Sequence, residues 1–99
     1  MTFLVRYTGG ARRDLVRLYE FLLELDIATA ERALDALRKS TEILHEFPFT
    51  CRKADDSNPF LRELIVPFGS SGYVVLFEID DATTVTILAV RHQREEDYH

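Results

Sequence analysis

The run "YVVLF" at residues 73–77, preceded by Gly72 and followed by Glu78, decides the fold class of this chain. Successive side chains of a β-strand point to opposite faces of a sheet, so a strand with one solvent-exposed face alternates apolar and polar residues. This run is apolar at every position. It therefore predicts a central strand, over Gly72–Ile79, that is covered on both faces.

Two further strands are predicted around this central one, over Phe60–Val66 and Thr83–Arg91. The connections, residues 67–72 and 80–82, are short enough for antiparallel hairpins. Residues 1–7 alternate like another strand, whereas the polar, turn-rich stretch Thr50–Pro59 is expected to form a surface loop.

Two amphipathic helices are predicted between the first strand and this loop. The first follows a cap at Thr8-Gly9-Gly10, and the second follows a cap at Asp26. The first apolar stripe is Leu15, Leu18, Leu22 and Leu25, and the second is Ala30, Ala33, Leu34, Leu37, Thr41 and Leu44. Both stripes are expected to pack in the core, and Phe47-Pro48-Phe49 is expected to end the second helix. The short connection between the helices implies an antiparallel helical hairpin.

The predicted element order is β-α-α-β-β-β, which is an α+β fold. An antiparallel helical hairpin would pack on one face of a curved, mainly antiparallel sheet. With 99 residues, the chain is expected to form a single domain spanning residues 1–99.

Composition narrows the function classes. Twelve Lys and Arg against 17 Asp and Glu give a net charge of −5, which argues against general attraction to phosphate backbones. No sequence-specific DNA binding by this chain alone is expected. No apolar run is long enough to cross a membrane, and the first residues lack the pattern of a secretory signal, so a cytoplasmic location is expected. Cys51 cannot form an intramolecular disulfide and is expected to be a small, partly buried residue in a loop. The spacing of His45, His92 and His99 fits no metal site, and no cofactor motif is present.

Several short motifs, taken together in this order, resemble the RelE/ParE superfamily of toxins, which includes plasmid stabilisation proteins. They are the Ala-x-x-Asp-Leu opening of the first helix at Ala11, Asp14 and Leu15; Leu61-Arg62-Glu63; Gly72-Tyr73; and a last strand ending in Val90-Arg91-His92. The resemblance spans Tyr7 to Tyr98.

The resemblance implies a growth-inhibiting toxin of a type II toxin–antitoxin module, held inactive by a cognate antitoxin whose C-terminal arm wraps over it. ParE-like members poison DNA gyrase and are not known as enzymes, whereas RelE-like members cut mRNA on the ribosome. The gyrase-directed mode is the first expectation here. An mRNA endonuclease, ribosome-dependent or free, is the alternative, and a degenerate non-toxic antitoxin-binding member is the third.

Ribonuclease chemistry needs proton-transfer groups and cations that stabilise the developing phosphorane charge. If the chain is a ribonuclease, the candidates are Arg62, His92, Arg94 and Tyr98. However, the resemblance places an active-site arginine of RelE-type ribonucleases at the position of Val74. The chain also has only two lysines, Lys39 and Lys53, whereas ribosome-dependent members are rich in lysine. Both departures favour the ParE-like branch, in which no catalytic residue is expected.

Candidate partner-binding residues are Arg12, Arg13, Arg17, Arg91 and Arg94. The first three lie off the leucine stripe, so they should form an exposed face of the first helix, either as solvated surface or as a contact for an acidic antitoxin arm or for the target. Arg91 and Arg94 could instead serve solubility or pair with Glu95 and Glu96.

Overall fold

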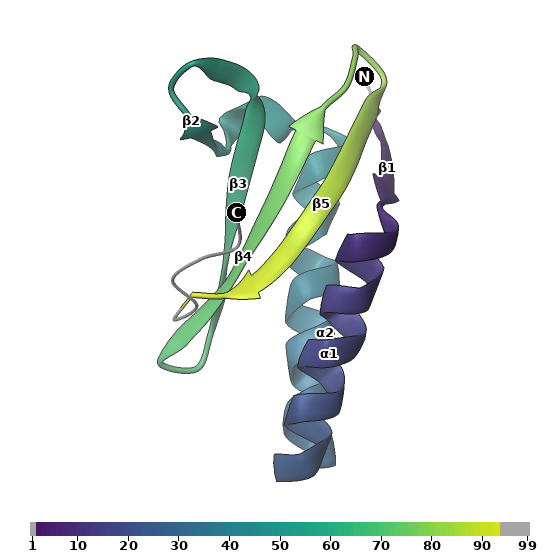
Figure 1. Cartoon of the computed structure of the whole chain (residues 1–99), viewed down its shortest axis with the longest axis vertical. Coiled ribbons are helices and arrows are strands. Elements are labelled where there is room, and N and C mark those ends of the chain that lie inside the picture. The colour runs from purple at the N-terminus through teal and green to yellow at the C-terminus, as the bar shows by residue number, and fades with distance from the viewer. Residues whose placement is uncertain (1, 94–99) are drawn as a thin grey trace.

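A computed structural model describes residues 2–93, and it has a single helical layer on one face of a five-stranded sheet (Figure 1). The elements are β1 (Leu4–Tyr7), α1 (Gly9–Leu25), α2 (Ile27–Thr41), β2 (Arg52–Asp55), β3 (Asn58–Phe68), β4 (Ser71–Ile79) and β5 (Thr84–His92). Two 3₁₀ helices, η1 (Glu42–His45) and η2 (Pro48–Thr50), join α2 to β2. The strand order is β1-β5-β4-β3-β2, in which β1 pairs parallel with β5 and every other pair is antiparallel. The predicted α+β fold class is confirmed.

Both predicted helix caps are present. The hydroxyl of Thr8 accepts a hydrogen bond from the backbone N–H of Ala11 at 3.0 Å, and the carboxylate of Asp26 accepts one from Thr29 at 3.1 Å. Each satisfies a backbone donor that the first helical turn leaves free. The end of α2 was predicted too late: the regular helix stops at Thr41, whose hydroxyl donates to the carbonyl of Arg38 at 3.0 Å, and the chain continues as 3₁₀ turns.

One strand was not predicted. The stretch read as a surface loop contains β2, which pairs with β3 through the turn at residues 55–58. Its sequence, Arg52-Lys53-Ala54-Asp55, has no apolar alternation, so only its backbone pairing with a neighbouring strand makes it a strand.

The β3–β4 hairpin is tighter than predicted, with Phe68 opposite Ser71 and Gly69 at φ 62° in the turn. A glycine is also required at Gly72. A Cβ atom at this position would lie 2.2 Å from the carbonyl oxygen of Val66, well inside contact distance. These two glycines fix the hairpin that supports the end of β5.

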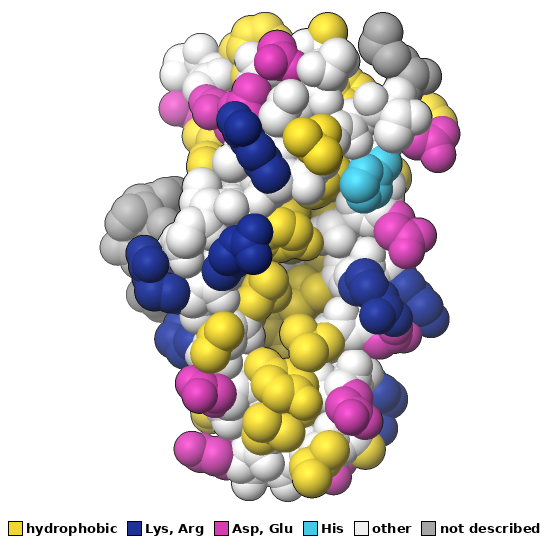
Figure 2. Space-filling view, turned by 90° about the vertical axis from the view of Figure 1, so that its right-hand side faces the viewer, with side chains coloured by type: hydrophobic (Ala, Val, Ile, Leu, Met, Phe, Trp, Pro, Cys, Tyr) yellow, Lys and Arg dark blue, Asp and Glu magenta, His cyan; other side chains and the backbone are white. Residues whose placement is uncertain are grey.

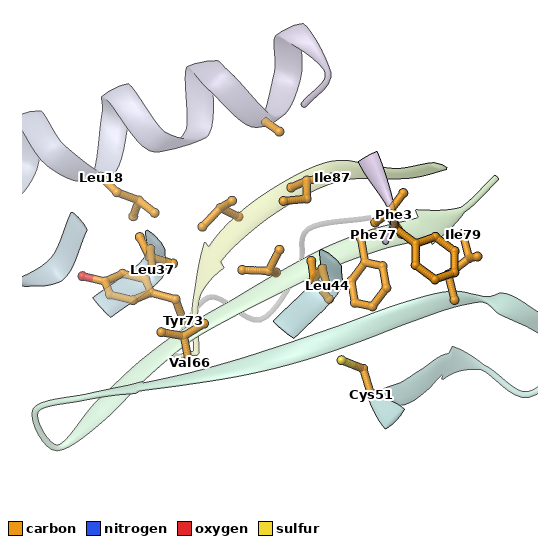
Figure 3. Close-up of a cluster of buried hydrophobic side chains, with 14 of the residues drawn as sticks. Phe3, Leu18, Leu37, Leu44, Cys51, Val66, Tyr73, Phe77, Ile79 and Ile87 are labelled. Carbon is orange, nitrogen blue, oxygen red and sulfur yellow. The ribbon is translucent and has the colours of Figure 1, made fainter. Parts of the chain in front are cut away.

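The core lies between the helices and the sheet. Tyr73, Val75 and Phe77 of β4 belong to it, and Figure 3 shows Tyr73 and Phe77 among Leu18, Leu37, Leu44 and Ile87. Val74 lies between them in sequence, outside this cluster, and is also buried, with 9% of its surface exposed. Leu76, the other residue of the run outside the cluster, is only partly buried, so the run is fully covered on the helix face and only in part on the opposite face.

The predicted stripes reach the core only in part. Leu18 and Leu37 are buried, but Leu25 is 67% exposed and Leu34 is 39% exposed, so their assignment to the core was wrong. Leu25 is the last residue of α1, and Figure 1 shows that the α1–α2 connection projects beyond the end of the sheet. No helix within residues 2–93 combines the length and the apolar character needed to cross a bilayer.

Candidate functional site

Arg62 of β3 is engaged by the backbone of its own chain. Its Nε donates to the carbonyl of Pro59 at 2.6 Å, and its Nη1 donates to the carbonyls of Phe49 and Cys51 at 3.1 and 2.8 Å. The guanidinium carbon also lies 5.4 Å from the centroid of the Phe49 ring. Arg62 thus ties η2 and the start of β2 to β3.

His92 ends β5 opposite Tyr73 of β4, with the two ring centroids 5.6 Å apart in an edge-to-face arrangement. Its Nε2 is 3.1 Å from the hydroxyl of Ser71. Burial raises the pKa of Tyr73, so this phenol stays neutral at physiological pH.

The structure does not bring Arg62 and His92 together. Arg62 on β3 lies opposite Phe77 of β4, and His92 on β5 lies opposite Tyr73 of β4. Along the strand direction, Arg62 and His92 are therefore separated by four residues of β4, or about 13 Å. Across the sheet they are separated by two strand spacings, or about 10 Å. Groups that act on one reacting phosphate must all lie within hydrogen-bond reach of it. The other two ribonuclease candidates, Arg94 and Tyr98, lie outside the described residues.

Val74 lies between Ile65 of β3 and Arg91 of β5. A cation is therefore its cross-strand neighbour. The guanidinium of Arg91, however, forms an ion pair with Asp14 of α1, and its side chain is 24% exposed.

Asp14 joins the first helix to the free edge of the last strand. Its Oδ1 pairs with Arg91, and its Oδ2 accepts a hydrogen bond from the backbone N–H of Val90 at 2.9 Å. Pairing between β1 and β5 ends at Tyr7 and Ile87, so this N–H lies beyond the reach of β1. Asp14 supplies the acceptor that an additional strand residue would otherwise provide.

The basic face of α1 is exposed, as predicted. Arg12, Arg13 and Arg17 are all accessible, and Arg17 lies 4.0 Å from Asp14. Of the five predicted partner-binding arginines, these three form one surface. Arg91 lies at the sheet edge and is paired to the same helix, and Arg94 lies outside the described residues.

A groove opens between α1 and α2, where the sheet leaves part of the two apolar stripes uncovered. Its volume is about 480 Å³, and it reaches down to Val75, Ile87 and Val90 of the sheet. Leu15 and Tyr19 of α1 and Leu34 and Leu37 of α2 line its walls. Figure 2 shows hydrophobic side chains gathered around this hollow.

Six large hydrophobic residues on the hairpin are exposed: Val16, Phe21, Leu23, Leu25, Ile27 and Leu34. A surface helix usually carries a single apolar stripe, but α1 has apolar residues on more than one face. This excess of apolar residues is readable in the sequence and makes the hairpin a candidate binding surface.

Cys51 is buried more fully than predicted, and its burial raises the pKa of the thiol, although Arg62 acts in the opposite direction. The thiol therefore stays protonated and is a poor nucleophile. Within residues 2–93, no group of three His, Cys, Asp or Glu side chains is arranged to hold a metal ion.

A two-helix hairpin on one face of a mainly antiparallel sheet, with a basic first helix and an open apolar groove, places the protein in the RelE/ParE class of small toxins. Residues 5–97 match the family described as the ParE toxin of type II toxin–antitoxin system, parDE, and the chain belongs to this family.

The relatives and solved structures agree with this assignment. The chain is 36% identical over 86 residues to the toxin RelE3 of Caulobacter vibrioides, covering 86% of this chain and 88% of that protein. It is 35% identical over 79 residues to the toxin RelE1 of the same organism, covering 80% and 82%.

Among solved structures, the chromosomal ParDE system from P. aeruginosa superposes with a TM-score of 0.73 at 16% identity, over 92% of this chain and 96% of that one. The toxin–antitoxin complex RelBE2 from Mycobacterium tuberculosis superposes with a TM-score of 0.57 at 28% sequence identity, over 94% of this chain and 100% of that one. The first of these likenesses shows the fold alone.

Proposed function

We propose that this toxin arrests growth by binding DNA gyrase and blocking or trapping its DNA-cleavage step. The observation that carries the proposal is the engagement of Arg62. Its guanidinium is committed to three backbone carbonyls of its own chain rather than directed at a substrate. The apolar Val74 cannot stabilise a phosphorane either. The chain's membership of the ParE family favours the same mode.

The test is gyrase supercoiling of relaxed plasmid with purified toxin titrated in, with and without ATP. Loss of supercoiled product, or appearance of linear cleaved DNA, at near-stoichiometric toxin is the expected result. No effect on gyrase, from a protein that still arrests growth when induced, would overturn the proposal. A preparation that neither affects gyrase nor arrests growth would instead identify a non-toxic member.

The exposed basic face of α1 is the first place to seek the gyrase contact. Charge reversal at Arg12 and Arg13 should weaken inhibition in graded steps, because neither side chain would act as a single catalytic group. Arg32→Glu on α2 is the matched control, since Arg32 is also an exposed helical arginine. Equal losses from all three substitutions would point to a general charge effect rather than to a contact on α1.

The second candidate is an mRNA endonuclease, which the names of the relatives RelE3 and RelE1 favour. In this case Arg62, His92, Arg94 and Tyr98 would share the chemistry. A double variant, His92→Ala with Tyr98→Phe, should then lose toxicity while keeping its fold, because loss of a proton-transfer group typically costs on the order of 10² to 10⁴ in rate. Retained toxicity would exclude this candidate.

We also propose that a cognate antitoxin covers the groove between α1 and α2, because both solved relatives come from toxin–antitoxin systems. The groove suits the apolar face of an amphipathic helix. Leu34→Glu, at the rim of the groove, should weaken antitoxin binding by tenfold or more in calorimetry. Phe47→Glu, at an exposed residue off the hairpin, should leave binding unchanged.

A further inference from the structure

A second cleft lies at the end of the sheet where η2, the β2–β3 turn and the β4–β5 loop meet. Its volume is about 600 Å³, and none of the residues lining it lines the groove between the helices. Its walls are aromatic and acidic: Phe49 and Phe60 contribute rings, and Glu78, Asp80 and Asp81 contribute carboxylates. We call it the aromatic cleft.

The two rings of the aromatic cleft are half-exposed. Phe49 and Phe60 each leave 50% of their surface accessible, and their centroids are 6.3 Å apart with planes at 73°. Apolar surface left in water costs about 25 cal/mol per Å², so a paired exposure of this kind is more typical of a binding surface than of a passive one. The contacts that Arg62 makes to the carbonyls of Phe49 and Pro59 hold the two rings in this arrangement.

One ring already binds a cation. The guanidinium of Arg62 lies 5.4 Å from the centroid of Phe49, within the range of a cation–π contact. Phe60, edge-to-face with Phe49, is left to supply a ring to a second cation.

The carboxylates make the cleft negative. No lysine or arginine is among the described residues that line it, whereas three acidic residues are. Asp81 accepts hydrogen bonds from the backbone N–H and hydroxyl of Thr83, and these bonds lower its pKa, so its charge persists into mildly acidic solution. One carboxylate oxygen of Asp80 accepts a hydrogen bond from Thr86 and pairs with the exposed Arg6. With this one cation set against three carboxylates, the net charge of the cleft is negative.

We propose that the aromatic cleft binds a lysine- or arginine-bearing segment of a protein partner. The rings supply the stacking surface for the side chain, and the carboxylates supply the opposite charge. The same carboxylates repel nucleic acid. The aromatic cleft shares no lining residue with the groove between the helices, so it can be tested separately from the proposed antitoxin site.

The probe for the test is a short fluorescein-labelled arginine-rich peptide, titrated with the full-length toxin and followed by fluorescence anisotropy. The matched peptide carries citrulline in place of arginine, which keeps the shape but removes the charge. The arginine peptide should bind at least tenfold more tightly, and added salt should weaken it. Equal affinity of the two peptides would overturn the proposal.

Variants locate the binding site. Glu78→Gln removes a charge without changing shape, and Phe60→Ala removes a ring; each should weaken peptide binding several-fold or more. Their controls are Glu46→Gln and Phe47→Ala, exposed residues that do not line the aromatic cleft. If Phe60→Ala fails to fold, amide chemical shifts of the unmodified toxin give the answer. Shifts centred on residues 78–82 support the cleft, and shifts centred on α1 or α2 contradict it.

Discussion

At the scale of single residues, Arg62 shows how a plausible catalytic candidate can be structural. From the sequence alone, an arginine between Leu61 and Glu63 fits a catalytic, charge-stabilising role as well as it fits a structural one. The three carbonyls it binds come from Phe49, Cys51 and Pro59, and two of them are more than ten positions away along the chain. No spacing rule predicts such a network, because it depends on how η2 packs against β3.

This arrangement predicts the behaviour of an Arg62→Gln variant. Removing a charged donor that serves three carbonyls should lower the free energy of unfolding by about 1.5–3 kcal/mol. Urea denaturation followed by circular dichroism measures this change. Toxicity should fall only in proportion to the loss of folded protein. A variant with unchanged stability and no toxicity would return Arg62 to the list of catalytic residues.

At the scale of elements, apolar periodicity predicted both helices and the strands β3, β4 and β5, and the residue types at Thr8 and Asp26 predicted the helix caps. Each of these elements has a local signature in the sequence. Periodicity did not predict β2, whose residues have no strand pattern and depend on pairing with β3. Nor did it separate buried from exposed apolar positions on the helices. Leu25 and Leu34 fit their stripes, but the sheet is too short to cover one and the groove leaves the other open.

The contact between α1 and β5 gives a second prediction. Asp14→Ala should destabilise the fold by about 1–3 kcal/mol, because it removes the acceptor of the Val90 N–H and one ion pair of Arg91. Amide hydrogen exchange at Val90 should accelerate more than exchange at Val85, which lies where β1 still covers the edge.

The control for Asp14→Ala is Asp35→Ala on α2. It removes two ion pairs, to Arg38 and Lys39, but these side chains are largely exposed. Its denaturation midpoint should match that of the unmodified protein. Uniform acceleration of exchange across β5 in Asp14→Ala would argue against a local role for Asp14.

At the scale of the whole molecule, the free energy of unfolding should decrease as the solution becomes acidic. Hydrogen bonds to local backbone and side-chain groups hold the pKa values of Asp26, Asp55 and Asp81 below their usual range. A folded-state pKa below the unfolded one contributes stability above the unfolded value, near 3.8 for Asp, and loses it as pH falls through the folded value.

The urea midpoint should therefore be nearly constant from neutral pH down to about 5 and fall below about 4. Asp26→Asn keeps an oxygen acceptor at the cap of α2 but cannot ionise, so the variant should show a shallower acid dependence. A midpoint that stays flat between pH 5 and 3 would show that these turns and caps add nothing to global stability.

The pairing of β1 with β5 also constrains the order of events during synthesis. Both strands lie at the same edge of the sheet, yet they sit about eighty positions apart along the chain, with Leu4 opposite Thr84. A nascent chain that has not yet produced β5 has no partner for β1, no acceptors for Thr8 and no strand edge for Asp14. Contacts this distant slow folding, because a long loop must close first. The sheet therefore cannot close until β5 has been synthesised, however early β1 and the two helices have formed.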